Sequence, residues 1–320
     1  MLAALGAEAP PAIEAELQIV ATRHHMALGA FHAAIPTAQR AVMLLRPLGA
    51  QLPLAYALTL LARALASQPT QRVEADRAID EALTIYDAAQ TEADRVRVDS
   101  RTGDSDLVRV TMSALATAFK AFTIDPQEID RRRELLTEAV ARYRVLHAGH
   151  YIIGVMLESL SDVELEAGNY DAALERALES VEFYRNARSA FGYIWALNAA
   201  GTASLAAGDV NAARRHAREL LTRSRRIGSA AGLGMALLLL AAVEANSGEG
   251  VRSAGLLGAW ETCAGMIDTP PATTSFLCAR VHAVLERNLE DNSIKAGSAA
   301  GRRWSIEEAF EIASAAAEER

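Results

Sequence analysis

The chain has 320 residues, is 51% hydrophobic and carries a formal net charge of −8. This much apolar sequence is ample to bury a core, and the acidic balance disfavours a nucleic-acid surface as the main feature of the protein. Two cysteines are too few for a disulfide framework and suit a reducing compartment.

The sequence shows no pattern typical of secretion or of a membrane anchor. Residues 1–11 lack the basic start and the long apolar run of a secretory signal. The most apolar run, Met235–Val243, is much shorter than the roughly 20 residues that a membrane-spanning helix needs. We therefore expect a cytoplasmic protein that is not held in a membrane.

The chain begins with a predicted helical hairpin. Residues 1–12 are rich in Ala and Pro, and we expect them to be frayed. Apolar residues at helical spacing then predict helices over 13–28 and 31–45. Pro36 falls in the second of these helices and is tolerated there if it lies in the first turn, where an amide has no partner.

Two more helical pairs are expected, at about 51–68 with 73–90 and at about 108–123 with 127–146. Between these pairs, residues 91–107 are polar and contain a glycine, which predicts a loop or an irregular extension. Inside the later pair, Asp125-Pro126 predicts an N-cap followed by a proline at the first helical position.

Three copies of one phrase organise the second half of the chain. Each begins with a glycine, and Gly168, Gly208 and Gly248 are 40 residues apart. A fixed period of this size is typical of a solenoid built from helix pairs. The glycines can end the first helix of each pair in a left-handed conformation, and Asn169 and Asp209 can cap the second helix.

Small residues recur where the two helices of a repeat would cross. They stand seven residues before the glycine and five residues after it, where a bulky side chain would push the helices apart. They are Ser161, Gly201 and Ala241 before the glycine, and Ala173 and Ala213 after it. In the third copy, Gly250 shifts the phrase by one residue, which predicts a slightly longer turn.

This pattern resembles the tetratricopeptide repeat, although the period is longer than the usual length of about 34 residues. The resemblance implies an all-α, right-handed superhelical solenoid. We expect the frayed segment at 1–12, the repeat array at 13–267 and capping helices at 268–320. Such caps would cover the apolar face of the last repeat.

The tail after the Pro-Pro pair predicts further helices. We expect a helix over about 274–290, a polar linker up to Gly301 and a short terminal helix. Ser305 and Glu308 have the spacing of a capping box at the start of this last helix.

The tail also resembles the helical arm of STAND-type ATPase regulators, a bacterial family that includes LuxR-type members. The resemblance rests on Gly255–Glu261, on the helix after the proline pair and on Ala300–Ala309, and it covers roughly 150–318. In that family a P-loop ATPase precedes the arm, and some members carry a terminal helix-turn-helix. This chain has neither a G-x-x-x-x-G-K-[ST] phosphate cradle nor a DNA-reading helix-turn-helix. The resemblance therefore implies only the sensor or scaffold part, in transcriptional or signal regulation.

The usual working surface of a solenoid is the concave face lined by the first helices. With the small crossing residue as register, one helical face selects the inward positions. Those expected to contact a protein, a peptide or a small effector are Glu158, Asp162, Trp195, Asn198, Thr202, Met235 and, in the first hairpin, Arg23. In this groove Trp195 is an aromatic platform, and the Asn198 amide can both donate to and accept from a peptide backbone. The purely structural alternative is that Trp195 packs within the superhelix and that the acidic side chains are solvated.

We expect neither catalysis nor a cofactor or metal, because no nucleophile with its base and no glycine-rich phosphate loop is visible. His147 and His150 lie at a predicted turn without further ligands. Two alternatives remain open: catalysis by Glu158 and Asp162, and DNA binding through the arginine-rich helix at 214–226. The leading hypothesis is a non-catalytic scaffold in which a ligand favours one superhelix curvature that a partner then reads.

Overall fold

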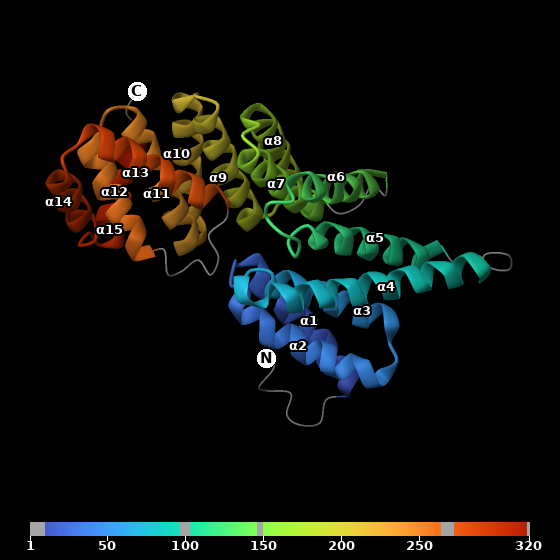
Figure 1. Ribbon diagram of the computed structural model, residues 1–320. Helices are drawn as coiled ribbons and strands as arrows, with labels where there is room; N and C mark the ends of the chain where they lie inside the picture. The colour runs from blue at the N-terminus through green and yellow to red at the C-terminus, as the bar shows by residue number, and fades with distance from the viewer. Residues whose placement is uncertain (1–9, 97–102, 146–149, 264–271, 319–320) are drawn as a thin grey trace. The chain divides into compact units, whose positions relative to one another are not determined.

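The computed structural model describes residues 10–96, 103–145, 150–263 and 272–318. Within these ranges the chain forms fifteen α-helices, two short 3-10 helices and no β-strand, which confirms the all-α prediction (Figure 1). Helices that follow one another in sequence pack in pairs, which is consistent with a helical repeat. The chain divides into two compact units, 1–149 and 150–320.

The first unit contains three helical hairpins. They are α1 (Pro11–Ala27) with α2 (Phe31–Leu45), α3 (Gln51–Leu65) with α4 (Arg72–Val96), and α5 (Gly103–Lys120) with α6 (Ile129–Val145). The 3-10 helices η3 (Arg46–Leu48) and η4 (Pro69–Gln71) precede and follow α3. These hairpins correspond to the three helical pairs that apolar spacing predicted for this part of the chain.

Three details of the prediction for this unit are wrong. The helices α4 and α5 run into the segment 91–107, because no glycine or proline interrupts the polar residues that end α4. Pro126 does not begin a helix, since α6 starts at Ile129 and the Asp125 carboxylate instead accepts from the Gln127 amide at 2.9 Å. Pro36 lies inside α2, beyond its first turn.

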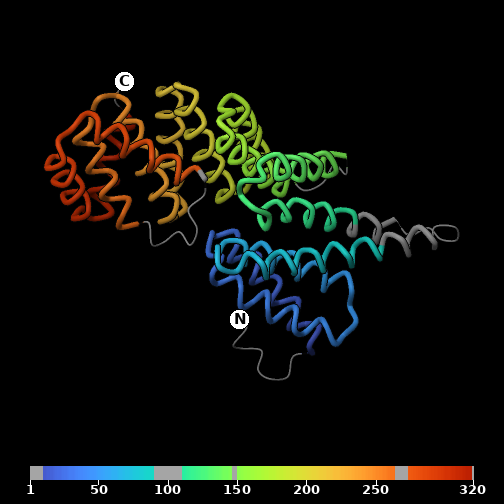
Figure 2. Tube along the Cα trace, in the orientation of Figure 1, coloured from blue at the N-terminus to red at the C-terminus, as the bar shows by residue number. Residues whose placement is uncertain are grey.

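The second unit contains the three repeats and three further helices. The repeats are α7 (His150–Glu166) with α8 (Tyr170–Asn186), α9 (Ala190–Ala206) with α10 (Val210–Ile227), and α11 (Ala230–Asn246) with α12 (Gly250–Cys263). The helices after them are α13 (Ala272–Asn288), α14 (Asp291–Gly301) and α15 (Ile306–Glu318). The trace in Figure 2 follows the repeats as successive hairpins of similar length.

The turns inside the three repeats have one geometry. Gly168, Gly208 and Gly248 have φ values of 77°, 91° and 88°, which confirms that each takes the left-handed conformation that ends a first helix. The third turn is not longer than the others. Its Glu249 amide donates to the Glu244 carbonyl at 2.9 Å, which is the same five-residue step as in the first two turns.

Side-chain caps follow the prediction at two of three positions. The Asp209 carboxylate accepts from the Ala212 amide at 2.8 Å and so caps α10. The Ser305–Glu308 capping box is complete, with reciprocal hydrogen bonds of 2.8 and 3.1 Å between backbone amides and side chains. Asn169 makes no cap, because its side-chain amide donates to a carboxylate at the end of α7.

The small crossing residues lie where they were predicted, between the two helices of each repeat. The Ser161 hydroxyl donates to the Ala173 carbonyl at 2.9 Å, and the Ser253 hydroxyl donates to the Ala241 carbonyl at 2.7 Å. A Cβ atom added at Gly201 would lie 3.3 Å from the Cβ of His216 on α10, and it would collide with Leu239 of the next repeat. Helix contact is therefore close enough at these positions that a larger side chain has no room.

The polar linker expected before Gly301 is in fact the helix α14. This helix packs on α12 with almost no side chain between the two backbones. Added Cβ atoms would collide with the Ser298 carbonyl at Gly258 and with the Gly255 carbonyl at Gly301. The helix is thus stabilised by tertiary packing of small residues, which leaves no apolar periodicity for a sequence pattern to detect.

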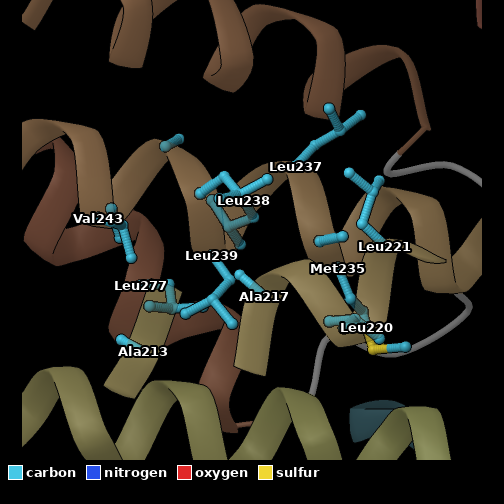
Figure 3. Close-up of a cluster of buried hydrophobic side chains, with 14 of the residues drawn as sticks. Ala213, Ala217, Leu220, Leu221, Met235, Leu237, Leu238, Leu239, Val243 and Leu277 are labelled. Carbon is cyan, nitrogen blue, oxygen red and sulfur yellow. The ribbon is translucent and has the colours of Figure 1, made fainter. Parts of the chain in front are cut away.

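The helix α11 lies at the centre of the second unit's core. Leu237, Leu238 and Leu239 leave it in different directions, yet none is more than 1% exposed. They pack with side chains of α10 and with Leu277 of α13 (Figure 3). A helix that is apolar on all sides must be covered on all sides, and α9, α10, α12, α13 and α15 all contact α11. Despite this apolar core, no helix in the described ranges combines the length and hydropathy that crossing a membrane requires.

Candidate functional site

The first helices of the three repeats form one layer of the second unit. The helix α9 contacts both α7 and α11, and each of α8 and α10 packs against the two first helices that flank it. We call α7, α9 and α11 the first-helix layer. This layer carries the predicted binding residues of the second unit.

The predicted residues differ in how far solvent reaches them. Glu158, Asp162 and Trp195 are half-buried. Asn198 and Met235 are each 2% exposed and Thr202 is fully buried. A ligand can reach the last three only if the packing around them opens. Arg23, the remaining member of the predicted set, is exposed and belongs to the first unit.

The first-helix layer is covered by α13, a helix from outside the repeats. This helix contacts all three helices of the layer. Four of its buried side chains, Thr273, Leu277, Val281 and Leu285, recur every four residues and are each at most 3% exposed. The sequence prediction treated this helix only as part of a cap, although its four-residue apolar spacing could have indicated a face that packs on another surface.

Contacts at both ends hold α13 across the layer. Near its start, the Asn198 side-chain amide donates to the Thr273 hydroxyl at 3.2 Å. One turn later, the Phe276 ring packs edge-on against the ring of Tyr170, with centroids 6.1 Å apart. Beyond its end, Leu289 lies so close to Gly250 that an added Cβ atom there would be 2.9 Å from it. A side chain at Gly250 would therefore require the Leu289 side chain to shift.

Glu158 is engaged by a tyrosine that passes between two first helices. The Tyr184 hydroxyl, from α8, donates to the Glu158 carboxylate at 3.2 Å. Its ring lies against Gly154 of α7 and Gly192 of α9, where added Cβ atoms would press on the ring or collide with it. Burial, together with the Glu158 charge, raises the pKa of Tyr184 well above its usual value. The hydroxyl therefore stays protonated and serves as a donor.

Tyr184 belongs to a series that the repeat analysis missed. Tyr86, Tyr143 and Tyr184 are each the fifteenth residue of a second helix, namely α4, α6 and α8. All three are buried, and burial raises the pKa of each hydroxyl. Their regular position within the helix pairs was the available signal. The same position in α10 is Ser224, which is also buried.

The arginine-rich face of α10 is partly occupied by the chain's own tail. Arg214 is 8% exposed and pairs with the fully buried Glu244 of α11 at 2.6 Å. Glu244 also pairs with Arg252 at 3.0 Å. Arg214 and Arg218 donate to the last carbonyls of α15, Ala316 and Ala317. Cations at a helix C-terminus stabilise it, so these arginines fix the terminal helix.

A second contact joins the other end of α10 to α15. The Arg225 guanidinium lies 4.0 Å from the centroid of the Phe310 ring, a cation–π distance. Three of the arginines that suggested DNA binding therefore contact α15. Arg223 pairs with Glu219 at 3.2 Å, on the exposed side of the helix.

Other residues considered from the sequence have ordinary surroundings. Cys263 is buried and Cys278 is half-buried, and burial raises the pKa of the Cys278 thiol to about 11. His147 lies outside the described residues. Among those that are described, no group of three or more His, Cys, Asp or Glu side chains could hold a metal ion.

Comparisons with known proteins add no family to these observations. No protein-family model matches the chain, and no curated protein matches it significantly.

Proposed function

We propose that this chain is a helical-repeat scaffold that binds a partner protein through the first-helix layer of its second unit. The observation that carries the proposal is α13. An amphipathic helix from outside the repeats already lies on this layer with its apolar stripe buried. Binding an amphipathic helix in an apolar groove is a recurring mode of peptide recognition.

The half-buried residues of the layer suggest what the partner carries. Glu158 and Asp162 place two carboxylates on α7, and Trp195 is a half-buried aromatic side chain on the neighbouring α9. Tryptophan is among the residue types that dominate binding energy, and acidic side chains favour a basic partner. We expect a helix with one apolar face and lysine or arginine at its flank.

The alternatives have less support. Glu158 accepts from the Tyr184 hydroxyl, and this packing contact explains the position of the carboxylate without invoking catalysis. DNA binding through α10 would compete with α15 for Arg214, Arg218 and Arg225. The resemblance of the tail to STAND-type regulators supports a setting in bacterial transcriptional or signal regulation, and we include that setting in the proposal.

The test places a photo-crosslinking phenylalanine derivative at position 195 and, as a control, at the exposed Arg215 on α10. A partner captured in a host lysate from position 195 alone is then purified. Its affinity for the wild-type chain is compared with that for Glu158→Lys. We expect a loss of about tenfold, because the charge reversal opposes a basic flank. Equal crosslinking from both positions, or unchanged affinity, would contradict the assignment of the site.

A further inference from the structure

We propose that α13 is a built-in competitor, which occupies the first-helix layer in place of the partner's helix and must leave before the partner binds. The inference rests on the proposed function. It adds a regulatory element and defines the chemistry of the helix that replaces α13.

The first argument is how α13 packs. The side chains of Thr273, Leu277, Val281 and Leu285 form a buried stripe, and the residues between them include the exposed Ala279, His282 and Ala283. One helix face thus makes the contact with the layer. A segment of this kind can be replaced by any helix that presents an equivalent stripe, because the layer contacts only side chains that recur at helical spacing.

The second argument is an imperfect polar contact beneath α13. Asn198 is 2% exposed, and its Nδ2 donates to the Thr273 hydroxyl. Its Oδ1 is buried and has no hydrogen-bond donor among the described residues. Turning the amide over would only exchange the two atoms, since this one hydroxyl meets one of them at a time. A buried polar atom without a partner weakens the packed state.

A similar mismatch lies further along the helix. The Arg280 Nη2 donates to the Asn246 side chain at 3.2 Å. The Arg280 Nε is buried and, in the described part of the chain, makes no hydrogen bond. The apolar stripe of α13 is therefore buried against the layer. Its polar contacts, in contrast, leave Asn198 Oδ1 and Arg280 Nε without hydrogen bonds among the described residues.

These mismatches specify a better occupant. A side-chain amide at the position of Thr273 can accept from Asn198 Nδ2 and donate to Asn198 Oδ1 at once. We therefore infer that the partner is an amphipathic helix with apolar residues every four positions and an Asn or Gln over Asn198. Its advantage over α13 comes from satisfying this amide.

Hydrogen exchange on the intact wild-type chain tests the competitor without needing any partner. If α13 opens by itself, its amides exchange at least about tenfold faster than those of α9 and α11, which stay protected until the unit unfolds. Exchange of α13 and α11 at one common rate would overturn the proposal, because α13 would then leave only on global unfolding.

The second test uses a labelled peptide with the sequence of residues 272–288 as the probe. The chains compared are the wild type, Val281→Asp, which places a charge on the buried face of α13, and Ala283→Asp, which places it on the exposed face. We expect the probe to bind Val281→Asp about 100-fold more tightly than the other two, because α13 no longer occupies the layer. Circular dichroism establishes whether the variants are folded. If they are not, hydrogen exchange on the wild-type chain still tests whether α13 opens independently.

A modified probe tests the chemistry of the occupant. A peptide carrying Thr273→Asn is expected to bind Val281→Asp about fivefold more tightly than the unmodified probe, since it satisfies both atoms of Asn198. Equal binding of the unmodified probe to all three chains, or to none, overturns the competitor. A failure of the lysate capture with normal probe binding would refute the proposed partner alone.

Discussion

The Tyr184 hydroxyl reaches the Glu158 carboxylate, 3.2 Å away, through a gap that two glycines leave between first helices. The ring occupies the volume where side chains at Gly154 and Gly192 would otherwise lie. The second helix of the same repeat therefore positions an acidic residue on the predicted binding face. Four residues on three helices act together at this point.

Gly192→Ala is expected to destabilise the second unit by about 2 kcal/mol, because overpacking the Tyr184 ring outweighs the gain in helix propensity. The matched control is Gly234→Ala on α11, whose added Cβ atom would lie 3.2 Å from the Cβ of Cys263. That change should alter stability by less than about 1 kcal/mol. Chemical unfolding of both variants checks the difference, and equal effects would show that the Tyr184 ring is not confined.

The buried tyrosines predict a loss of stability at high pH. Burial raises the folded-state pKa of Tyr86, Tyr143 and Tyr184 above the unfolded value of about 10. Their contribution to stability is fully present below that pH and falls as the pH rises above it, since the unfolded chain ionises first. The part of the tyrosinate absorbance that comes from these three of the seven tyrosines should therefore appear in a step that coincides with the loss of helical circular dichroism. Ionisation of all seven tyrosines with the helices intact would contradict this.

Replacing the Asn198–Thr273 contact with apolar residues is expected to stabilise the docking of α13. Thr273→Val alone leaves the whole Asn198 amide without a partner and should cost about 1–2 kcal/mol. Asn198→Leu combined with Thr273→Val removes every polar atom of the contact and should recover at least the wild-type stability. The double variant should also bind the 272–288 probe less well than the wild type. Stability equal to the sum of the two single losses would count against the interpretation.

Glu244 is expected to be one of the most sensitive charged residues. Glu244→Gln leaves Arg214 and Arg252 beside a neutral group in a buried site, at a cost of about 3–5 kcal/mol. The control is Glu182→Gln, which breaks an exposed pair with Arg185 and should cost less than about 1 kcal/mol. Thermal unfolding distinguishes these outcomes. Equal effects would indicate that the buried site relaxes or admits water.

The helical pairs could be predicted because their signals are local. The left-handed glycines, the Asp209 cap and the Ser305–Glu308 capping box all depend on residues within one or two turns of each other. The crossing residues Ser161, Ala173 and Ala241 could also be predicted, since the repeat period placed them in register, whereas Ser253 was missed because the third turn was expected to be longer. Each of these features depends on residues at a short or fixed spacing in the sequence, so the sequence pattern alone indicates it.

The cover on the first-helix layer could not be predicted, because it depends on contacts between distant segments. Asn198 meets Thr273 across 75 positions, and no spacing within either helix indicates that meeting. The helix α14 was missed for the same reason, since Gly258 and Gly301 define a backbone contact and no apolar stripe. Of the predicted second-unit residues, Asn198, Thr202 and Met235 are buried.

The position of α11 between α13 and α15 has a consequence for how the protein is made. The helix α11 contacts α15, and Arg214 of the neighbouring α10 is joined to Ala316 over 102 positions, so the surroundings of α11 are complete only when α15 has packed on the repeats. Until then a helix that is apolar on every side stays partly uncovered on the nascent chain. Such surfaces are the ones that aggregate or recruit chaperones during synthesis. Docking of α15 therefore ends the period in which the apolar surface of α11 needs protection.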